Sequence, residues 1–256
     1  LRIPGGAPPM KRRTLTAVCV VCLLLIAGCA APTNAPQSDA AVTASDMRDA
    51  SAVIQAHTTT LQSQPFTARS TTTVRDANST FHVTINQTWK VDSRRPVRAL
   101  AVRTSTATDS APARYQQAPD RITAWRHGNE TTVRVESRNK TDIRQVKLLN
   151  SSVRLNRALH RQLLYKYSTR RNATVETLSR NGTTFYRVQA SLNDTHIASN
   201  ASMTLLVNQA GYVTRIETRQ TVAYRSGPRV ITRTVRFDRI GTTTVTSPSW
   251  AERTRD

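Results

Sequence analysis

Residues 81–91 read Phe-His-Val-Thr-Ile-Asn-Gln-Thr-Trp-Lys-Val, and large apolar side chains alternate with polar ones almost without a break. Because successive side chains of a β-strand point to opposite faces of a sheet, this period of two predicts a strand with one buried and one exposed face. A second alternating stretch surrounds residue 205. The apolar residues of the two stretches are the first candidates for an interior lining: Phe81, Val83, Ile85, Trp89, Met203, Leu205 and Val207.

The stretches on either side of residues 81–91 predict further strands joined by short turns. Residues 66–75 are rich in threonine and alternate more weakly, and Asp76-Ala77-Asn78 supply the turn of a hairpin. Downstream, strands are expected at 97–106, 122–126 and 131–137, with a loop at 107–119.

The C-terminal part of the chain returns to strands after a helical segment. Asn181-Gly182, between two β-rich runs, is a strong hairpin signal that fits a type I′ turn. Alternation predicts strands at 186–192, 203–207, 212–218 and 231–237, and a short strand over 240–250 that Pro248 ends.

Two segments have helical periodicity instead. The first helix is expected at about 46–61, with Ser45 as its N-cap and acidic residues in its first turn, where the helix dipole favours them. His57 lies on its apolar stripe without a neighbouring acid or second histidine, so a hydrogen-bonded core histidine is expected. The second helix is expected at 152–166.

The order of these elements predicts a mainly β (α+β) domain over residues 45–256. About ten strands in local hairpins form a long antiparallel meander, which must curl and cover its exposed edges. We therefore expect a single curved antiparallel sheet, an open half-barrel, with the N-terminal and the central helix on its concave face.

The first 44 residues are typical of an export signal followed by a tether. A basic patch at 11–13 precedes an apolar run of about 13 residues, which is shorter than the roughly 20 needed to span a bilayer. Ile26-Ala27-Gly28-Cys29 resembles a lipobox, so residues 1–28 are interpreted as upstream residues and a lipoprotein signal peptide, and 29–44 as a flexible, lipid-anchored tether. An uncleaved membrane anchor and cleavage without lipidation are the alternatives.

Cys29 is then the sole thiol of the mature protein. Cys19 and Cys22 leave with the signal peptide, so the mature chain has no disulfide. The expected location is the extracytoplasmic face of the cell membrane, with the lipid on Cys29 as the membrane partner.

The chain is strongly basic, with 37 Lys and Arg against 16 Asp and Glu and a net charge of +21. Removing residues 1–28 leaves +17. The arginines could reflect only codon usage at exposed positions, or they could attract anionic lipid headgroups or envelope polymers. Nucleic acid is not expected as a partner, because stacking aromatics are not interleaved with the basic residues and the chain is exported.

Nine of the twelve asparagines begin an Asn-x-Ser/Thr sequon, although chance would give about three at this Ser and Thr content. N-glycosylation outside the membrane is one reading, and a Thr-rich composition in exposed strands is the other. The candidate acceptors are Asn78, Asn86, Asn129, Asn139, Asn150, Asn172, Asn181, Asn193 and Asn200.

The sequence offers no pattern for catalysis. The five histidines have no HxH, HExxH or cysteine partners, so no metal site is expected. A nucleophile elbow, a Gly-rich phosphate loop and a close pair of acids are also lacking, so neither enzymatic activity nor a cofactor is expected.

The lipobox, tether, amphipathic helix, meander with a central helix, and a C-terminal G-x-x-x-V-x-x-P-x-W motif (Gly241, Val245, Pro248, Trp250) resemble uncharacterised lipoproteins of haloarchaea. The architecture of those proteins is similar to the LolA/LppX-like half-barrel, which holds a lipid or an acyl chain. The strongly basic charge departs from the usual acidity of haloarchaeal proteins.

Two functions are compatible with this pattern. The resemblance implies a membrane-anchored lipoprotein that binds or carries a lipophilic ligand in the half-barrel, and the protein is expected to be a monomer. The alternative is a cell-envelope interaction protein with a basic, glycosylated surface, whose candidate lining residues simply pack under the helices.

Overall fold

The computed structural model describes residues 43–252 except 79, 95, 139 and 148–151, and the proposed Cys29, Asn139 and Asn150 sites lie outside the described residues. Eleven antiparallel strands form one open sheet in the described part of the chain, in the order β6-β5-β4-β3-β2-β1-β11-β10-β9-β8-β7. The strands are β1 (Phe66–Asp76), β2 (His82–Asp92), β3 (Arg98–Ala107), β4 (Arg121–His127), β5 (Glu130–Ser137), β6 (Lys140–Lys147), β7 (Arg170–Arg180), β8 (Thr183–Leu192), β9 (Ala198–Asn208), β10 (Val213–Val222) and β11 (Arg229–Asp238). The expected single open antiparallel sheet is confirmed, with eleven strands in place of about ten.

The sheet consists of two meanders that meet at its centre. Strands β1 to β6 step outward to one edge, strands β7 to β11 step inward from the other, and β1 pairs with β11. The chain must therefore cross from the β6 edge to the β7 edge in the segment between them. Eleven strands spaced about 4.8 Å apart span roughly 48 Å, so this crossover has to run over one face of the sheet.

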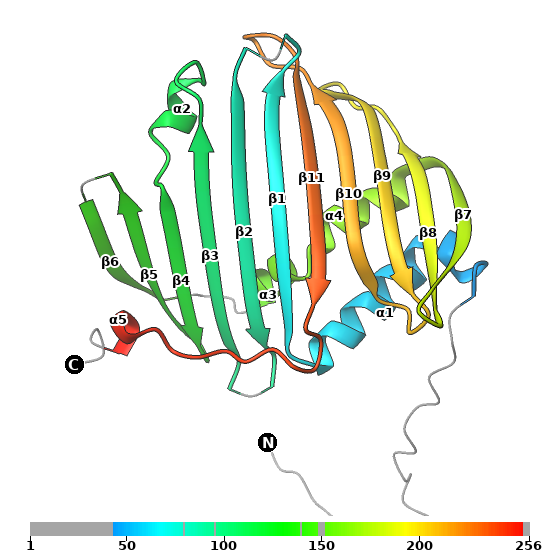
Figure 1. Cartoon of the computed structure of the whole chain (residues 1–256), viewed down its shortest axis with the longest axis horizontal. Coiled ribbons are helices and arrows are strands. Elements are labelled where there is room, and N and C mark those ends of the chain that lie inside the picture. Colours follow the sequence, from blue (N-terminus) through cyan, green and yellow to red (C-terminus); the bar gives the residue numbers. More distant parts are fainter. Residues whose placement is uncertain (1–42, 79, 95, 139, 148–151, 253–256) are drawn as a thin grey trace, which may run out of the picture. The chain divides into compact units, whose positions relative to one another are not determined.

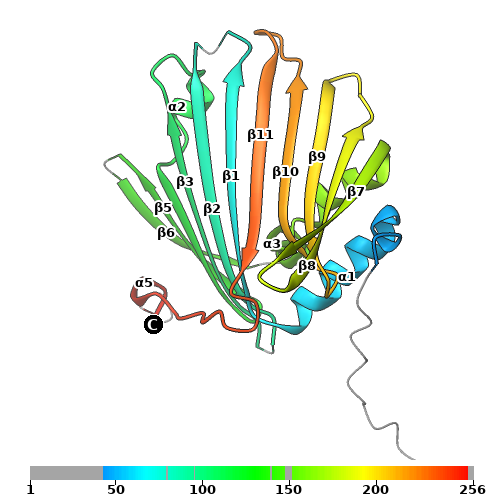
Figure 2. The same cartoon turned by 45° about the vertical axis from the view of Figure 1, so that its right-hand side comes forward.

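The crossover carries α3 (Ser152–Ala158), α4 (Arg161–Tyr165) and the 3-10 helix η2 (Lys166–Thr169). These helices lie on the same face as α1 (Ala50–Ser63), whereas α5 (Ser249–Glu252) lies on the opposite face (Figure 1). The view in Figure 2 shows α1 beside the β7–β10 half of the sheet. None of the helices in the described part of the chain is both long and apolar enough to span a membrane.

The two predicted helices differ from the structure at their ends. The first is a 3-10 turn, η1 (Asp46–Arg48), followed by α1, and the N-cap of α1 is Asp49, whose carboxylate accepts from the N–H groups of Ser51 and Ala52. The second breaks at His160, which has a left-handed backbone with φ of 51°. Asp49 is the better cap because a β-region backbone aims its carboxylate at the free N–H groups.

The structure differs from the sequence prediction in further segments. Residues 140–147 form the edge strand β6, which was not predicted. The predicted strand over 240–250 is wrong, because this segment begins in a turn, has no strand pairing and ends in α5. The loop at 107–119 contains one short helix, α2 (Ala113–Gln116).

The C-terminal segment is held by its apolar residues against the face opposite the crossover. Val245 and Trp250 are buried with Trp125 in a small cluster that also contacts Leu100. Gly241, with φ of +80°, donates its N–H to the carbonyl oxygen of Pro65 at 2.7 Å, which sets the turn out of β11. The Gly-Val-Trp part of the motif therefore has a structural role.

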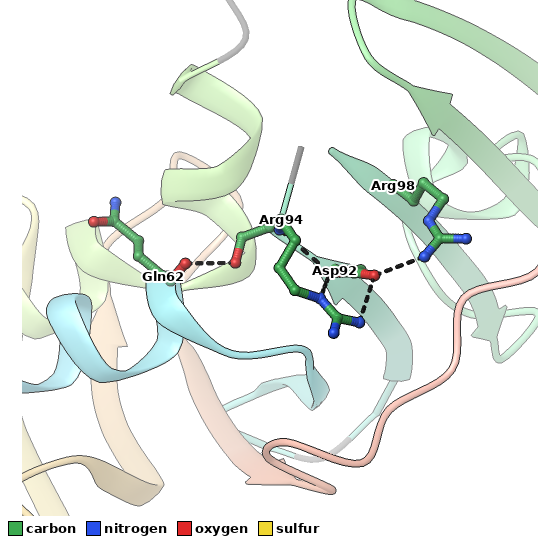
Figure 3. A network of polar contacts seen from close by, with 5 residues as sticks. Gln62, Asp92, Arg94 and Arg98 are labelled. Carbon is green, nitrogen blue, oxygen red and sulfur yellow. Dashed lines mark hydrogen bonds and ion pairs between the residues drawn. The ribbon is translucent and has the colours of Figure 1, made fainter. Parts of the chain in front are cut away.

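A buried carboxylate fixes the β2–β3 turn beside the end of α1. Asp92, only 2% exposed, accepts from Arg94 at 2.8 Å and from Arg98 at 2.8 Å, and Ser93 Oγ donates to the carbonyl oxygen of Gln62 at 2.6 Å (Figure 3). The hydrogen bonds from Arg94, followed by those from Arg98, lower the pKa of Asp92 to about 2, against the effect of burial.

We expect Asp92→Asn to lower the free energy of unfolding at pH 7 by about 1–2 kcal/mol, a value reduced for the solvent exposure of both arginines. Because the folded-state pKa lies below the ordinary 3.8, the contribution of Asp92 is present above pH 3.8 and is lost as the pH falls through about 2. Urea titrations at pH 7 and pH 2 measure it, with Asp109→Asn on an exposed loop as the control. An equal deficit at both pH values would contradict this role.

Candidate functional site

The helices cover only part of the face on which they lie. Side chains of α1, α4 and η2 pack with those of β8 to β11 in a filled core that includes Leu61, Leu164 and Tyr167. In front of β1 to β5, where only α3 and the start of α4 approach, a cavity of about 570 Å³ remains. Its volume is within the usual range for small-molecule sites. Its lining residues are Ser70, Thr72, Ile85, Gln87, Trp89, Ala101, Arg103, Ile122, Ala124, Val133, Asn156, Arg157, His160, Gln162, Leu163 and Arg233.

Strand register arranges the sheet wall of the cavity in three rows of cross-strand neighbours. The apolar row consists of Phe237, Ala68, Trp89, Ala101, Ala124 and Val133. The mixed row consists of Val235, Ser70, Gln87, Arg103 and Ile122. The third row, Arg233, Thr72 and Ile85, is called the Arg233 row.

These rows give the cavity two chemically different ends. Two residues along a strand advance about 6.7 Å, so the apolar row and the Arg233 row lie roughly 13 Å apart. Beside the apolar row, Leu155 and Ala158 of α3 line a small pocket shared with Trp89, Ala101 and Ala124. The wall is therefore apolar under α3 and becomes cationic along the strands toward the Arg233 row.

Two buried polar atoms in the cavity wall have no hydrogen-bond partner among the residues that the structure describes. They are Trp89 Nε1 and His160 Nε2. An indole N–H can only donate, and a buried donor without an acceptor costs free energy relative to water. Both residues line the cavity, but the two nitrogens themselves are buried beneath its surface.

The two histidines on this side of the sheet differ in their partners. His57 is fully buried, and its ring accepts from the N–H of Val213 at 3.2 Å and lies 3.1 Å from the carbonyl oxygen of Leu159. Burial lowers its pKa to about 4, against the Leu159 hydrogen bond, so it is neutral near pH 7. The prediction of a hydrogen-bonded core histidine is confirmed.

His160 is also neutral, because a neighbouring positive charge acts on it in addition to burial. Burial, then the positive charge of Arg233, then His57, lower its pKa to about 3. The charge of Arg233 also contributes, after burial, to lowering the pKa of Lys166. The guanidinium of Arg233 therefore acts on two neighbouring basic groups.

The seven predicted lining residues are divided among three places. Ile85 and Trp89 line the cavity. Phe81 and Val83 are buried in a separate cluster with Val74 and Ala111. Met203, Leu205 and Val207 belong to the filled core.

The polar lining residues did not figure among the sequence candidates, although a signal for them exists. In the alternation of residues 81–91, Gln87 occupies a position that the period assigns to the interior. Arg103 follows Ala101 at the interior spacing in β3, and Arg233 precedes Val235 at the same spacing in β11. Polar side chains at interior positions of neighbouring strands predict a wet or ligand-bound region.

The sequon asparagines that the structure describes are all exposed: Asn78, Asn86, Asn129, Asn172, Asn181, Asn193 and Asn200. Asn86 lies on the sheet face opposite the cavity, where its Oδ1 accepts from Thr71 at 2.9 Å. A glycan there would extend away from the cavity. Within the described residues, no three His, Cys, Asp or Glu side chains lie close enough together to hold a metal ion.

No protein-family model matches the sequence, and no curated protein matches it. Among solved structures, a DUF1329 family protein from Desulfovibrio piger shares 8% identity over 80% of this chain and 98% of its own, with a TM-score of 0.31. A LolA superfamily protein from Nitrosomonas europaea shares 9% identity over 78% of this chain and 96% of its own, with a TM-score of 0.27. The MucA/MucB complex of Pseudomonas aeruginosa shares 11% identity over 79% of this chain and 60% of its own, with a TM-score of 0.32. Because these TM-scores are low, the fold is assigned from the strand order of this chain and not from its similarity to the solved structures.

Proposed function

We propose that this domain binds a lipophilic molecule in the cavity beside the crossover helices. The observation that carries the proposal is the apolar row, which continues from the filled core into an uncovered space of about 570 Å³. Apolar surface in a concave site gains free energy when a hydrocarbon chain displaces water from it, at about 25 cal/mol per Å². The LolA/LppX-like resemblance implies the same class of ligand.

The proposed setting is the extracytoplasmic face of the cell membrane, with Cys29 carrying the lipid anchor. A flexible tether over residues 29–44 would let the domain reach the bilayer surface, where a hydrophobic ligand resides. The proposed role is binding or carrying, not catalysis.

The alternative of an envelope interaction protein without a ligand cavity is disfavoured by the cavity itself. A basic, glycosylated surface is nevertheless compatible with ligand binding in the cavity. The seven described sequon asparagines are exposed, and anionic envelope polymers would contact the outer surface of the domain.

The test is to purify the full chain from its native membrane, extract it with organic solvent and analyse the extract by mass spectrometry. We expect a hydrocarbon-chain molecule at near-stoichiometric amount, and the intact mass would also report glycans on the sequons. A protein that is consistently empty and binds no lipid probe would rule out the proposed function.

A further inference from the structure

The cavity contains uncompensated positive charge. Among the residues that the structure describes, its lining includes three arginines (Arg103, Arg157 and Arg233) and no aspartate or glutamate. None of these three forms an ion pair within the part of the chain that the structure describes, although eight other arginines there do. Because these three guanidinium groups have no carboxylate partner there, they are available to an incoming anion.

Arg233 is the most buried of the three. It is half-buried in the wall, and its Nε donates to Thr72 Oγ1 at 3.0 Å, which fixes the plane of the guanidinium at the third row. Burial lowers its pKa, as expected for a cation that loses water without gaining a carboxylate. An oxyanion with two acceptor oxygens matches the fork of N–H donors that a guanidinium presents.

The other donors approach from different walls of the cavity. Arg103 projects from β3 one row nearer the hydrocarbon end, and Arg157 comes from α3 on the helical side. His160 stays neutral beside Arg233 and adds no charge there. The guanidinium groups are thus available to a ligand, whereas the apolar row offers apolar surface.

We propose that the ligand is an anionic amphiphile whose oxyanion head group, carboxylate or phosphate, binds Arg233 while its hydrocarbon chain lies on the apolar row. This inference rests on the proposed function, since it names the class of molecule that the same cavity takes. A spacing of about 13 Å between the Arg233 row and the apolar row allows one molecule to reach both.

Calorimetric titration of the delipidated full chain with three twelve-carbon probes tests the inference. Dodecyl phosphate and dodecanoate carry the two candidate head groups, and dodecanol carries the same chain without charge. We expect one or both anions to bind at least 10-fold more tightly than dodecanol, and the tighter of them identifies the head group. Arg233→Gln should remove most of that preference, whereas Arg233→Lys should retain part of it.

Arg236→Gln is the matched control, because Arg236 is exposed on the same strand and faces away from the cavity. The control should bind all three probes like the wild type. Equal affinities for dodecanol and both anions in the wild type would overturn the inference while leaving the proposed function standing. Failure of all three probes to bind would overturn both.

Discussion

An Ala124→Trp variant is expected to bind a hydrocarbon-chain probe at least 10-fold more weakly than the wild type. Ala124 lies in the apolar row and lines both the large cavity and the small pocket under α3. An indole at this position would occupy the space that a chain needs, and a 10-fold loss corresponds to about 1.4 kcal/mol of binding free energy. Titration of the delipidated protein with dodecanol measures it.

Thr106→Trp provides the matched control for Ala124→Trp. Thr106 is an exposed residue of β3 on the face opposite the cavity, so the same bulky side chain meets solvent there. Thermal unfolding of both variants shows whether either loses its fold, because overpacking a site can cost 1–3 kcal/mol. Wild-type affinity in a folded Ala124→Trp variant would show that the chain binds elsewhere or not at all.

Cys29→Ser is expected to move the protein from the membrane fraction to the soluble fraction. The prediction follows from the proposed lipidation, because two chains on one cysteine suffice for stable anchoring, whereas a single chain gives only marginal binding. Fractionation of expressing cells followed by immunodetection measures the distribution. The change should be nearly complete.

Cys22→Ser separates lipidation from a general effect of losing a thiol. Cys22 lies in the apolar run of the signal, so its replacement should leave the protein membrane-bound. Retention of Cys29→Ser in the membrane fraction would instead favour an uncleaved anchor.

The sheet was predictable because its strands carry their own signal. The alternation at 81–91 predicts β2 to within a residue, since each side chain reports the face on which it lies. The edge strand β6 was not predicted, because its sequence lacks such an alternation. Both faces of an edge strand can meet solvent, and the described residues of β6 before Lys147 are mostly exposed, so no period of two remains.

Long-range contacts account for the other errors. The segment 240–250 was expected to form a strand, but Trp250 instead packs on Trp125 of β4, a contact that no local pattern reports. The central helix was expected to be continuous, but it breaks at His160 after Leu159, whose carbonyl lies next to the ring of His57 in α1. These positions depend on tertiary packing, which overrides helix and strand propensity.

The cavity could be predicted only in part. Ile85 and Trp89 follow from alternation, yet Met203 and Leu205 have the same pattern and lie in the filled core. The crossover helices cover some apolar residues of the sheet and leave others exposed to the cavity. The position of these helices depends on the strand order of the whole sheet and cannot be read from any one strand. Polar residues at interior positions, such as Gln87, distinguish the strands that line the cavity from those of the filled core better than the apolar residues do.

The position of the three tryptophans permits a direct test of the central claim, that a hydrocarbon chain binds on the apolar row. Trp89 lies in the cavity, whereas Trp125 and Trp250 lie in the cluster on the opposite face. A brominated acyl chain quenches the fluorescence of an indole that it contacts. Titration of the full chain with brominated dodecanoate is predicted to quench a saturable part of the emission, and Trp89→Phe should abolish that part while Trp125→Phe preserves it. Saturable quenching that survives Trp89→Phe, or none in the wild type, would contradict the account.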